Sequence, residues 1–80
     1  MEKKDILLRL TEIFKRVFKD NSLSISEEST ANDIDQWDSL SHMILITEVE
    51  QAFAIKFKLK DLNKMRNVGD MMDIIILKSN

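Results

Sequence analysis

Hydrophobic residues recur at helical spacing near the start of the chain. Between residues 4 and 19 they fall on one side of a helical wheel: Ile6, Leu7, Leu10, Ile13, Phe14 and Val17. Charged side chains fall on the opposite side, as in an amphipathic helix that packs on a core. The pattern predicts a first helix of about four turns that ends at Asp20–Asn21, where Asn21 can adopt a left-handed cap conformation.

A polar stretch, residues 21–37, then interrupts the helical period. It is rich in Ser, Asp, Glu, Asn and Thr and contains no glycine or proline. Loops of this length in a small domain are usually functional or loosely ordered. Four apolar residues are candidates for anchoring it to the core: Leu23, Ile25, Ile34 and Trp37. We expect Trp37 to act through packing, because large aromatic side chains contribute most as buried area.

The second predicted helix, residues 39–53, has two apolar faces. The expected core face consists of His42, Leu45, Ile46, Val49, Ala52 and Phe53. The opposite face carries Leu40, Met43, Ile44 and Thr47, flanked by Glu48 and Glu50. One core does not require both faces, so the second face either covers another helix or is a docking surface with an acidic rim. The spacing alone does not separate these two interpretations.

The rest of the chain predicts two further helices. Leu59, Leu62 and Met65 suit a helix of one or two turns, whereas the alternation over residues 55–58 is too short to indicate a strand. Asn67 can cap a last helix with Asp70 in its first turn and Lys78 near its end. We therefore predict one all-α domain, residues 1–80. It is a four-helix bundle with a short third helix and a long loop between the first two helices. Met71 and Met72 are expected to fill its core.

Length and composition limit the classes of function that the chain can have. With 80 residues, of which 44% are hydrophobic, the chain can form one core but not a deep catalytic cleft. It has no cysteine, so any thiol chemistry must come from a cofactor. No stretch approaches the roughly 20 apolar residues that span a bilayer. We expect a cytoplasmic monomer without a membrane span.

The charges are segregated along the chain. The net charge is −2, but residues 21–53 hold seven acidic side chains and no Lys or Arg. An acidic middle segment attracts basic protein surfaces and repels nucleic acid. A helix-turn-helix DNA-binding protein is disfavoured, because the second helix has no cation for phosphate contacts.

The junction between the loop and the second helix carries a family resemblance. The stretch Ile34-Asp35-Gln36-Trp37-Asp38-Ser39-Leu40, and a helix ending Glu48-Val49-Glu50-Gln51-Ala52-Phe53, resemble the acyl and peptidyl carrier proteins. The resemblance implies that Ser39 takes a 4'-phosphopantetheine arm from coenzyme A. The thiol of this arm then carries an acyl or aminoacyl group as a thioester. Asp38 and Leu40 would be recognised by the phosphopantetheinyl transferase that installs the arm.

The resemblance also implies partners and a cargo site. A loading ligase and downstream transferases or synthases, with basic docking surfaces, would bind Leu40, Met43, Ile44, Thr47, Glu48 and Glu50. The cargo would either fold back between the second and third helices, against Ile46, Leu62 and Ile75, or stay outside the bundle, and the sequence does not separate these two cases. Housekeeping fatty-acid carriers usually have acidic residues where this chain has Ser41 and Ile44. This departure implies more hydrophobic docking and a dedicated pathway of fatty-acid, polyketide or nonribosomal-peptide type.

Three other functions could be read from the same residues: a hydrolase, a calcium-binding loop and a non-covalent adaptor. A hydrolase built on Ser39, His42 and Asp38 would crowd three groups on one helical turn, without a visible oxyanion hole. We expect the imidazole ring of His42 to be neutral and paired with a neighbouring residue. A calcium loop starting at Asp33 lacks glycine at its sixth position and glutamate at its twelfth, which excludes it. A non-covalent helical adaptor remains the alternative, and it predicts that Ser39 is never modified.

Overall fold

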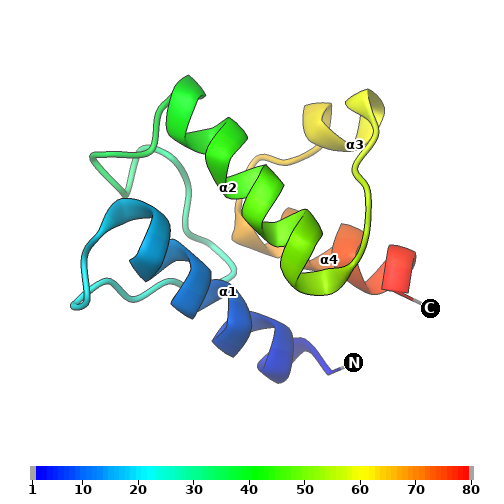
Figure 1. Cartoon of the computed structure of the whole chain (residues 1–80), viewed down its shortest axis with the longest axis horizontal. Coiled ribbons are helices and arrows are strands. Elements are labelled where there is room, and N and C mark those ends of the chain that lie inside the picture. The colour runs from blue at the N-terminus through cyan, green and yellow to red at the C-terminus, as the bar shows by residue number, and fades with distance from the viewer. Residues whose placement is uncertain (1, 80) are drawn as a thin grey trace.

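Four α-helices make up the computed structural model, which describes residues 2–79. They are α1 (Lys3–Phe18), α2 (Ser39–Phe53), α3 (Leu59–Asn63) and α4 (Val68–Ser79). Figure 1 shows α1, α2 and α4 as the long elements, with the short α3 at one end of the molecule. The all-helical fold, the short third helix and the long loop after the first helix are confirmed. No helix within residues 2–79 is long and apolar enough to cross a membrane.

The core is built from one apolar face of each long helix. Its largest fully buried side chains come from α1, α2 and α4: Ile6, Leu10, Phe14, Leu45, Val49, Val68, Met71, Met72 and Ile75. Complete burial of such a side chain contributes about 1.5–3 kcal/mol. Met71 and Met72 are each 1% exposed, which confirms their predicted place in the core.

The long loop is anchored to the core by side chains. Ile34 is buried, and Leu23, Ile25 and Trp37 pack partly buried against the core. The ring of Trp37 lies edge-on to that of Phe14, with their centroids 5.2 Å apart and an interplanar angle of 89°. This geometry is favourable for aromatic pairs, and it confirms packing as a role of Trp37.

Backbone hydrogen bonds fasten the same loop to the start of α4. The Val68 N–H donates to Ser29 O at 2.9 Å, and the Gly69 N–H donates to Glu27 O at 2.7 Å. Helix N-termini leave such N–H groups without intrahelical partners, so the loop carbonyls take the place of the missing turn. The backbone approaches closely here, since a Cβ on Gly69 would lie 3.0 Å from Glu27 O. This contact explains a glycine at this position.

Two predicted helix ends differ from the structure. Residue Lys19, with φ 54° and ψ 44°, takes the left-handed cap of α1, so the prediction that Asn21 caps this helix is wrong. The helix stops once Phe18 has reached the core, and the Asp20 carboxylate then accepts hydrogen bonds from Ser22 that turn the chain. At the other end of the molecule α3 stops at Asn63, so Met65 follows the short helix instead of belonging to it.

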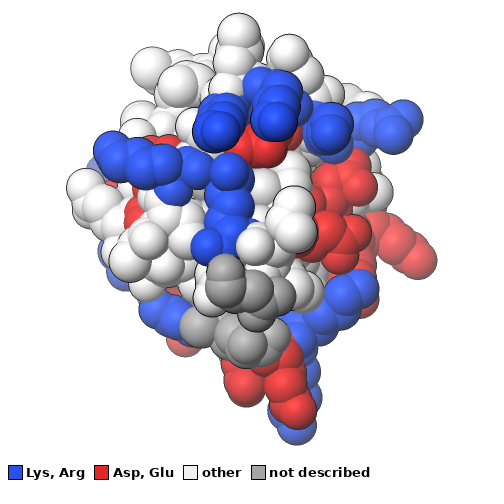
Figure 2. Space-filling model, turned by 90° about the vertical axis from the view of Figure 1, so that its right-hand side faces the viewer, with Lys and Arg blue, Asp and Glu red and all other residues white. Residues whose placement is uncertain are grey.

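Basic side chains gather around α3. Lys56, Lys58, Lys60, Lys64 and Arg66 have no ion-pair partner among residues 2–79. Figure 2 looks onto the side of the molecule where α3 and the C-terminus lie, and shows Lys and Arg side chains along its upper part, over α3. The region around α3 therefore differs in sign from the acidic loop that leads into α2.

Candidate functional site

Ser39 is the first residue of α2, and its position depends on a well-formed helix cap. The carboxylate of Asp38 accepts a 2.9 Å hydrogen bond from the Ser41 N–H. In return, the Ser41 hydroxyl oxygen accepts a 2.8 Å bond from the Asp38 N–H, which completes a capping box. The Ser41 hydroxyl also donates to Gln36 O at 2.8 Å. The backbone on both sides of Ser39 is thereby held in place.

The side chain of Ser39 itself is left available. Ser39 is exposed, and its hydroxyl forms no hydrogen bond with any residue in the described part of the chain. Hydrogen bonds from the backbone N–H and then the hydroxyl of Ser41 lower the pKa of Asp38, which is therefore ionised at neutral pH. Negative charge is favourable at a helix N-terminus, so this position also suits a phosphate ester.

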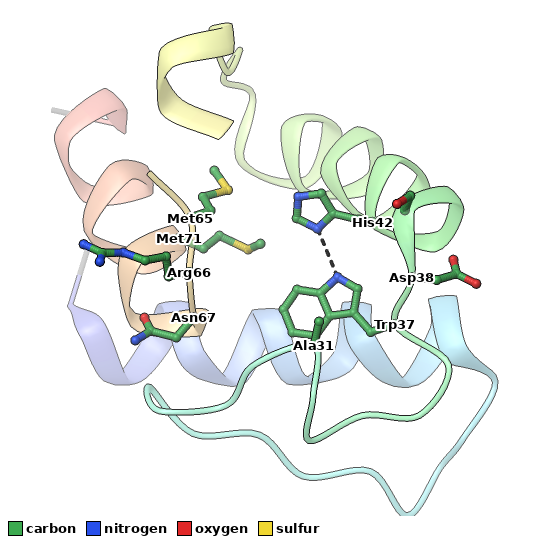
Figure 3. A pocket seen from close by; sticks show the side chains of 9 residues that line it. Ala31, Trp37, Asp38, His42, Met65, Arg66, Asn67 and Met71 are labelled. Carbon is green, nitrogen blue, oxygen red and sulfur yellow. Dashed lines mark hydrogen bonds between the residues drawn. The ribbon is translucent and has the colours of Figure 1, made fainter. Parts of the chain in front are cut away.

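An open pocket of about 370 Å³ adjoins Ser39 (Figure 3). One wall comes from the loop and the first turn of α2: Ala31, Trp37, Asp38, Ser39 and His42. The other wall comes from the segment between α3 and α4 and the first turn of α4: Met65, Arg66, Asn67 and Met71. A volume of a few hundred Å³ is typical of small-molecule sites. The sequence did not indicate this pocket, because its two walls are distant in the chain.

His42 is paired within this pocket, as predicted. The Nε1–H of Trp37 donates to His42 Nδ1 at 3.0 Å, and the two rings stack with an interplanar angle of 23°. Burial lowers the pKa of His42, so the ring is neutral at pH 7. Within residues 2–79, no side-chain hydrogen bond joins Ser39, His42 and Asp38, since the Asp38 carboxylate bonds Ser41 and the His42 ring bonds Trp37. These three side chains do not form a catalytic triad.

The outer face of α2 is exposed. Leu40, Met43 and Ile44 have exposed fractions of 74%, 53% and 50%. Thr47 is also exposed, and its hydroxyl donates to Met43 O. Within residues 2–79 this apolar face is therefore not covered by another helix, and the interpretation that it packs on one is wrong.

The two acidic residues beside this face have intramolecular partners that their spacing in the sequence did not indicate. Glu48 forms a 2.8 Å ion pair with Arg16 of α1. Glu50 accepts a 2.8 Å hydrogen bond from the Phe57 N–H, which holds the connection after α2. Ile46 and Ile75, expected near a cargo, are buried, and Leu62 packs partly buried against the core.

A small helical bundle with an exposed serine at a helix start, beside an open pocket, has the architecture of the covalent carrier domains. The family of the phosphopantetheine attachment site matches residues 8–75, and the chain belongs to this family. No curated protein matches the chain. Members of the family are non-catalytic carriers whose prosthetic group is 4'-phosphopantetheine.

Two solved structures of acyl carrier proteins resemble this chain. The solution structure of a holo acyl carrier protein from Geobacter metallireducens is 51% identical, with a TM-score of 0.85. The match covers 90% of this chain and 83% of that one. The crystal structure of an acyl carrier protein from Thermotoga maritima is 28% identical, with a TM-score of 0.82 and coverage of 98% and 91%. The chain is thus a member of the acyl carrier protein family.

Proposed function

We propose that Ser39 is the residue that bears the 4'-phosphopantetheine arm. The observation that carries this proposal is an exposed hydroxyl, without a hydrogen-bond partner in residues 2–79, at the first position of α2. The capping box keeps this hydroxyl away from the core, and the helix N-terminus favours the negative phosphodiester. The arm supplies the thiol that the chain, which has no cysteine, lacks. Its role is to hold an acyl group as a thioester.

Acyl groups are the class of cargo that we propose. Both structural relatives are named acyl carrier proteins, and this supports an acyl over an aminoacyl intermediate. A loading enzyme would place the acyl group on the arm, and downstream transferases or synthases would receive the loaded protein. Asp38 and Leu40 flank Ser39 and are exposed, so a phosphopantetheinyl transferase would contact both.

We propose that partner enzymes dock on this protein mainly through apolar contacts. Such a surface suits a carrier that serves a dedicated pathway. Leu40, Met43 and Ile44 are accessible, whereas the carboxylates of Glu48 and Glu50 already have intramolecular partners. Basic groups on a partner would meet the acidic loop before α2 and would be repelled by the cations around α3. The two signs of charge would therefore orient the partner on the carrier.

Intact mass spectrometry tests the attachment site. After incubation with coenzyme A and a broad-specificity phosphopantetheinyl transferase, the protein should gain the mass of one phosphopantetheine. Ser39→Ala should gain none, and Ser41→Ala, which removes the other hydroxyl of the same turn, should still be modified. If the wild-type protein gains no mass while a known carrier is modified in parallel, the carrier proposal is wrong and the non-covalent adaptor is supported.

A charge-restoration experiment tests the docking mode. Binding to a general fatty-acid ketosynthase should be weak and nearly independent of salt. The double variant Ser41→Glu/Ile44→Glu restores the acidic pattern of housekeeping carriers, and it should bind more tightly at low salt. Leu8→Glu, on the exposed part of α1, is the matched control and should not change binding. Tight, salt-sensitive binding by the wild-type protein would refute apolar docking.

A further inference from the structure

His42 occupies a special place relative to the proposed attachment serine. It lies one helical turn after Ser39, so both side chains lie on the same side of α2, and both line the pocket. Across the pocket lie the thioether side chains of Met65 and Met71 (Figure 3). The pocket therefore places an imidazole opposite an apolar wall, close to Ser39.

Trp37 determines which ring nitrogen of His42 carries the proton. The indole N–H is a donor only, so the Nδ1 that receives it at 3.0 Å must have a free lone pair. A neutral imidazole with an unprotonated Nδ1 carries its proton on Nε2. Trp37 is itself held against Phe14 and Phe18, which keeps the donor in place. Burial, which lowers the pKa of His42, favours the same neutral form.

The second nitrogen of His42 is left as a donor within the pocket. Figure 3 shows it on the side of the ring that faces Met65. It has no hydrogen-bond partner within residues 2–79. The charged groups at the pocket do not compete for it, because the Asp38 carboxylate bonds Ser41 and the Arg66 side chain points away from the pocket. This donor is accessible from the open pocket, because the described residues hold no buried side-chain nitrogen or oxygen without a partner, so a ligand in the pocket can reach it.

We propose that the Nε2–H of His42 is the hydrogen-bond donor that holds an amide carbonyl of the phosphopantetheine arm against the pocket. This inference rests on the proposed attachment at Ser39. Between its phosphate and its thiol, the arm carries a dimethyl-substituted carbon and two secondary amides. The methionine wall suits the apolar segment, and the His42 donor suits one amide carbonyl. Trp37 acts as a positioning residue, because it fixes the tautomer that makes His42 a donor.

Nuclear magnetic resonance of the holo protein tests this assignment. The protein is first modified and its added mass confirmed, and then compared with holo His42→Phe, which keeps an aromatic ring but has no N–H. In the wild-type protein we expect cross-relaxation between the His42 ring protons and protons of the arm, and a tautomer with its proton on Nε2. In His42→Phe the contacts with the arm should be lost. Gln51→Ala, at an exposed position near the end of the same helix, should retain them.

Trp37→Phe provides a second, independent measurement. It removes the indole N–H, so the nitrogen-15 shifts of His42 should change to those of mixed tautomers, and the contacts with the arm should weaken. Absence of added mass would refute the attachment proposal itself. Added mass together with an arm as mobile in the wild-type protein as in His42→Phe would overturn only the role of His42. Retention of the tautomer in Trp37→Phe would overturn only the role of Trp37.

Discussion

Replacement of Gly69 by alanine tests how the long loop is fastened to α4. Gly69 does not have a positive φ, so the effect of the methyl group is steric. Its Cβ would lie 3.0 Å from Glu27 O and 3.3 Å from Asn67 Oδ1. The first of these atoms accepts the Gly69 N–H, and the second accepts the Asp70 N–H at 2.8 Å. The added methyl group would therefore push on two hydrogen bonds at the start of α4.

Two opposing terms decide the size of the effect. Each hydrogen bond contributes about 0.5–1.5 kcal/mol, so the loss of both costs about 2 kcal/mol. Alanine gains about 1 kcal/mol over glycine in helix propensity. We therefore expect Gly69→Ala to lower the free energy of unfolding by about 1 kcal/mol, and the melting temperature by about 4–8 °C.

Urea denaturation of matched variants provides the measurement. Leu77, also in α4, is 76% exposed, so the difference between Leu77→Ala and Leu77→Gly reports helix propensity alone. There the alanine variant should be more stable by about 1 kcal/mol. If Gly69→Ala is as stable as the wild-type protein or more stable, the Glu27 carbonyl moves freely and the steric argument is refuted.

Three further predictions concern the cap of α2, an ion pair and a titrating group. Ser41→Ala removes the hydroxyl that accepts from the Asp38 N–H and should lower the urea-derived free energy of unfolding by about 1 kcal/mol; an unchanged value would contradict the capping role. A double-mutant cycle on Arg16 and Glu48, whose side chains are 63% and 32% exposed, should give a coupling of about 0.2–1 kcal/mol that falls with added salt. Because burial lowers the pKa of His42, the unfolded chain takes up the proton first, so stability should fall as the pH decreases below about 6.5. Urea midpoints at about pH 7.5 and 5.5 should differ less in His42→Phe than in the wild-type protein.

The helices and the position of Ser39 could be predicted because their signals are local. The apolar period of α2 begins directly after Asp38, a preferred capping residue, and the structure starts the helix at Ser39. The apolar period of α1 likewise indicates its core face, since Ile6, Leu10 and Phe14 are fully buried. Within one helix, the spacing of residues is enough to indicate which of them share a face.

The contacts that surround the site could not be predicted in the same way. Arg16 and Glu48 are 32 residues apart, and their ion pair depends on how α1 packs against α2. The carboxylate of Glu50 looks like part of a docking rim in the sequence, but the turn after α2 brings the Phe57 N–H to it. The left-handed conformation of Lys19 had no compositional signal, because glycine and asparagine are the usual residues there.

The backbone hydrogen bonds between the long loop and α4 limit how far the two walls of the pocket can move apart, and so the size of a guest molecule that the pocket could hold. Ser29 O and Glu27 O accept from the first N–H groups of α4, and Ala31 and Asn67, close to these bonds, belong to opposite walls of the pocket. Two peptide hydrogen bonds therefore tie the loop that carries one wall to the helix that carries the other. A guest that exceeds the volume of the pocket would have to break this backbone clasp or stay in contact with water.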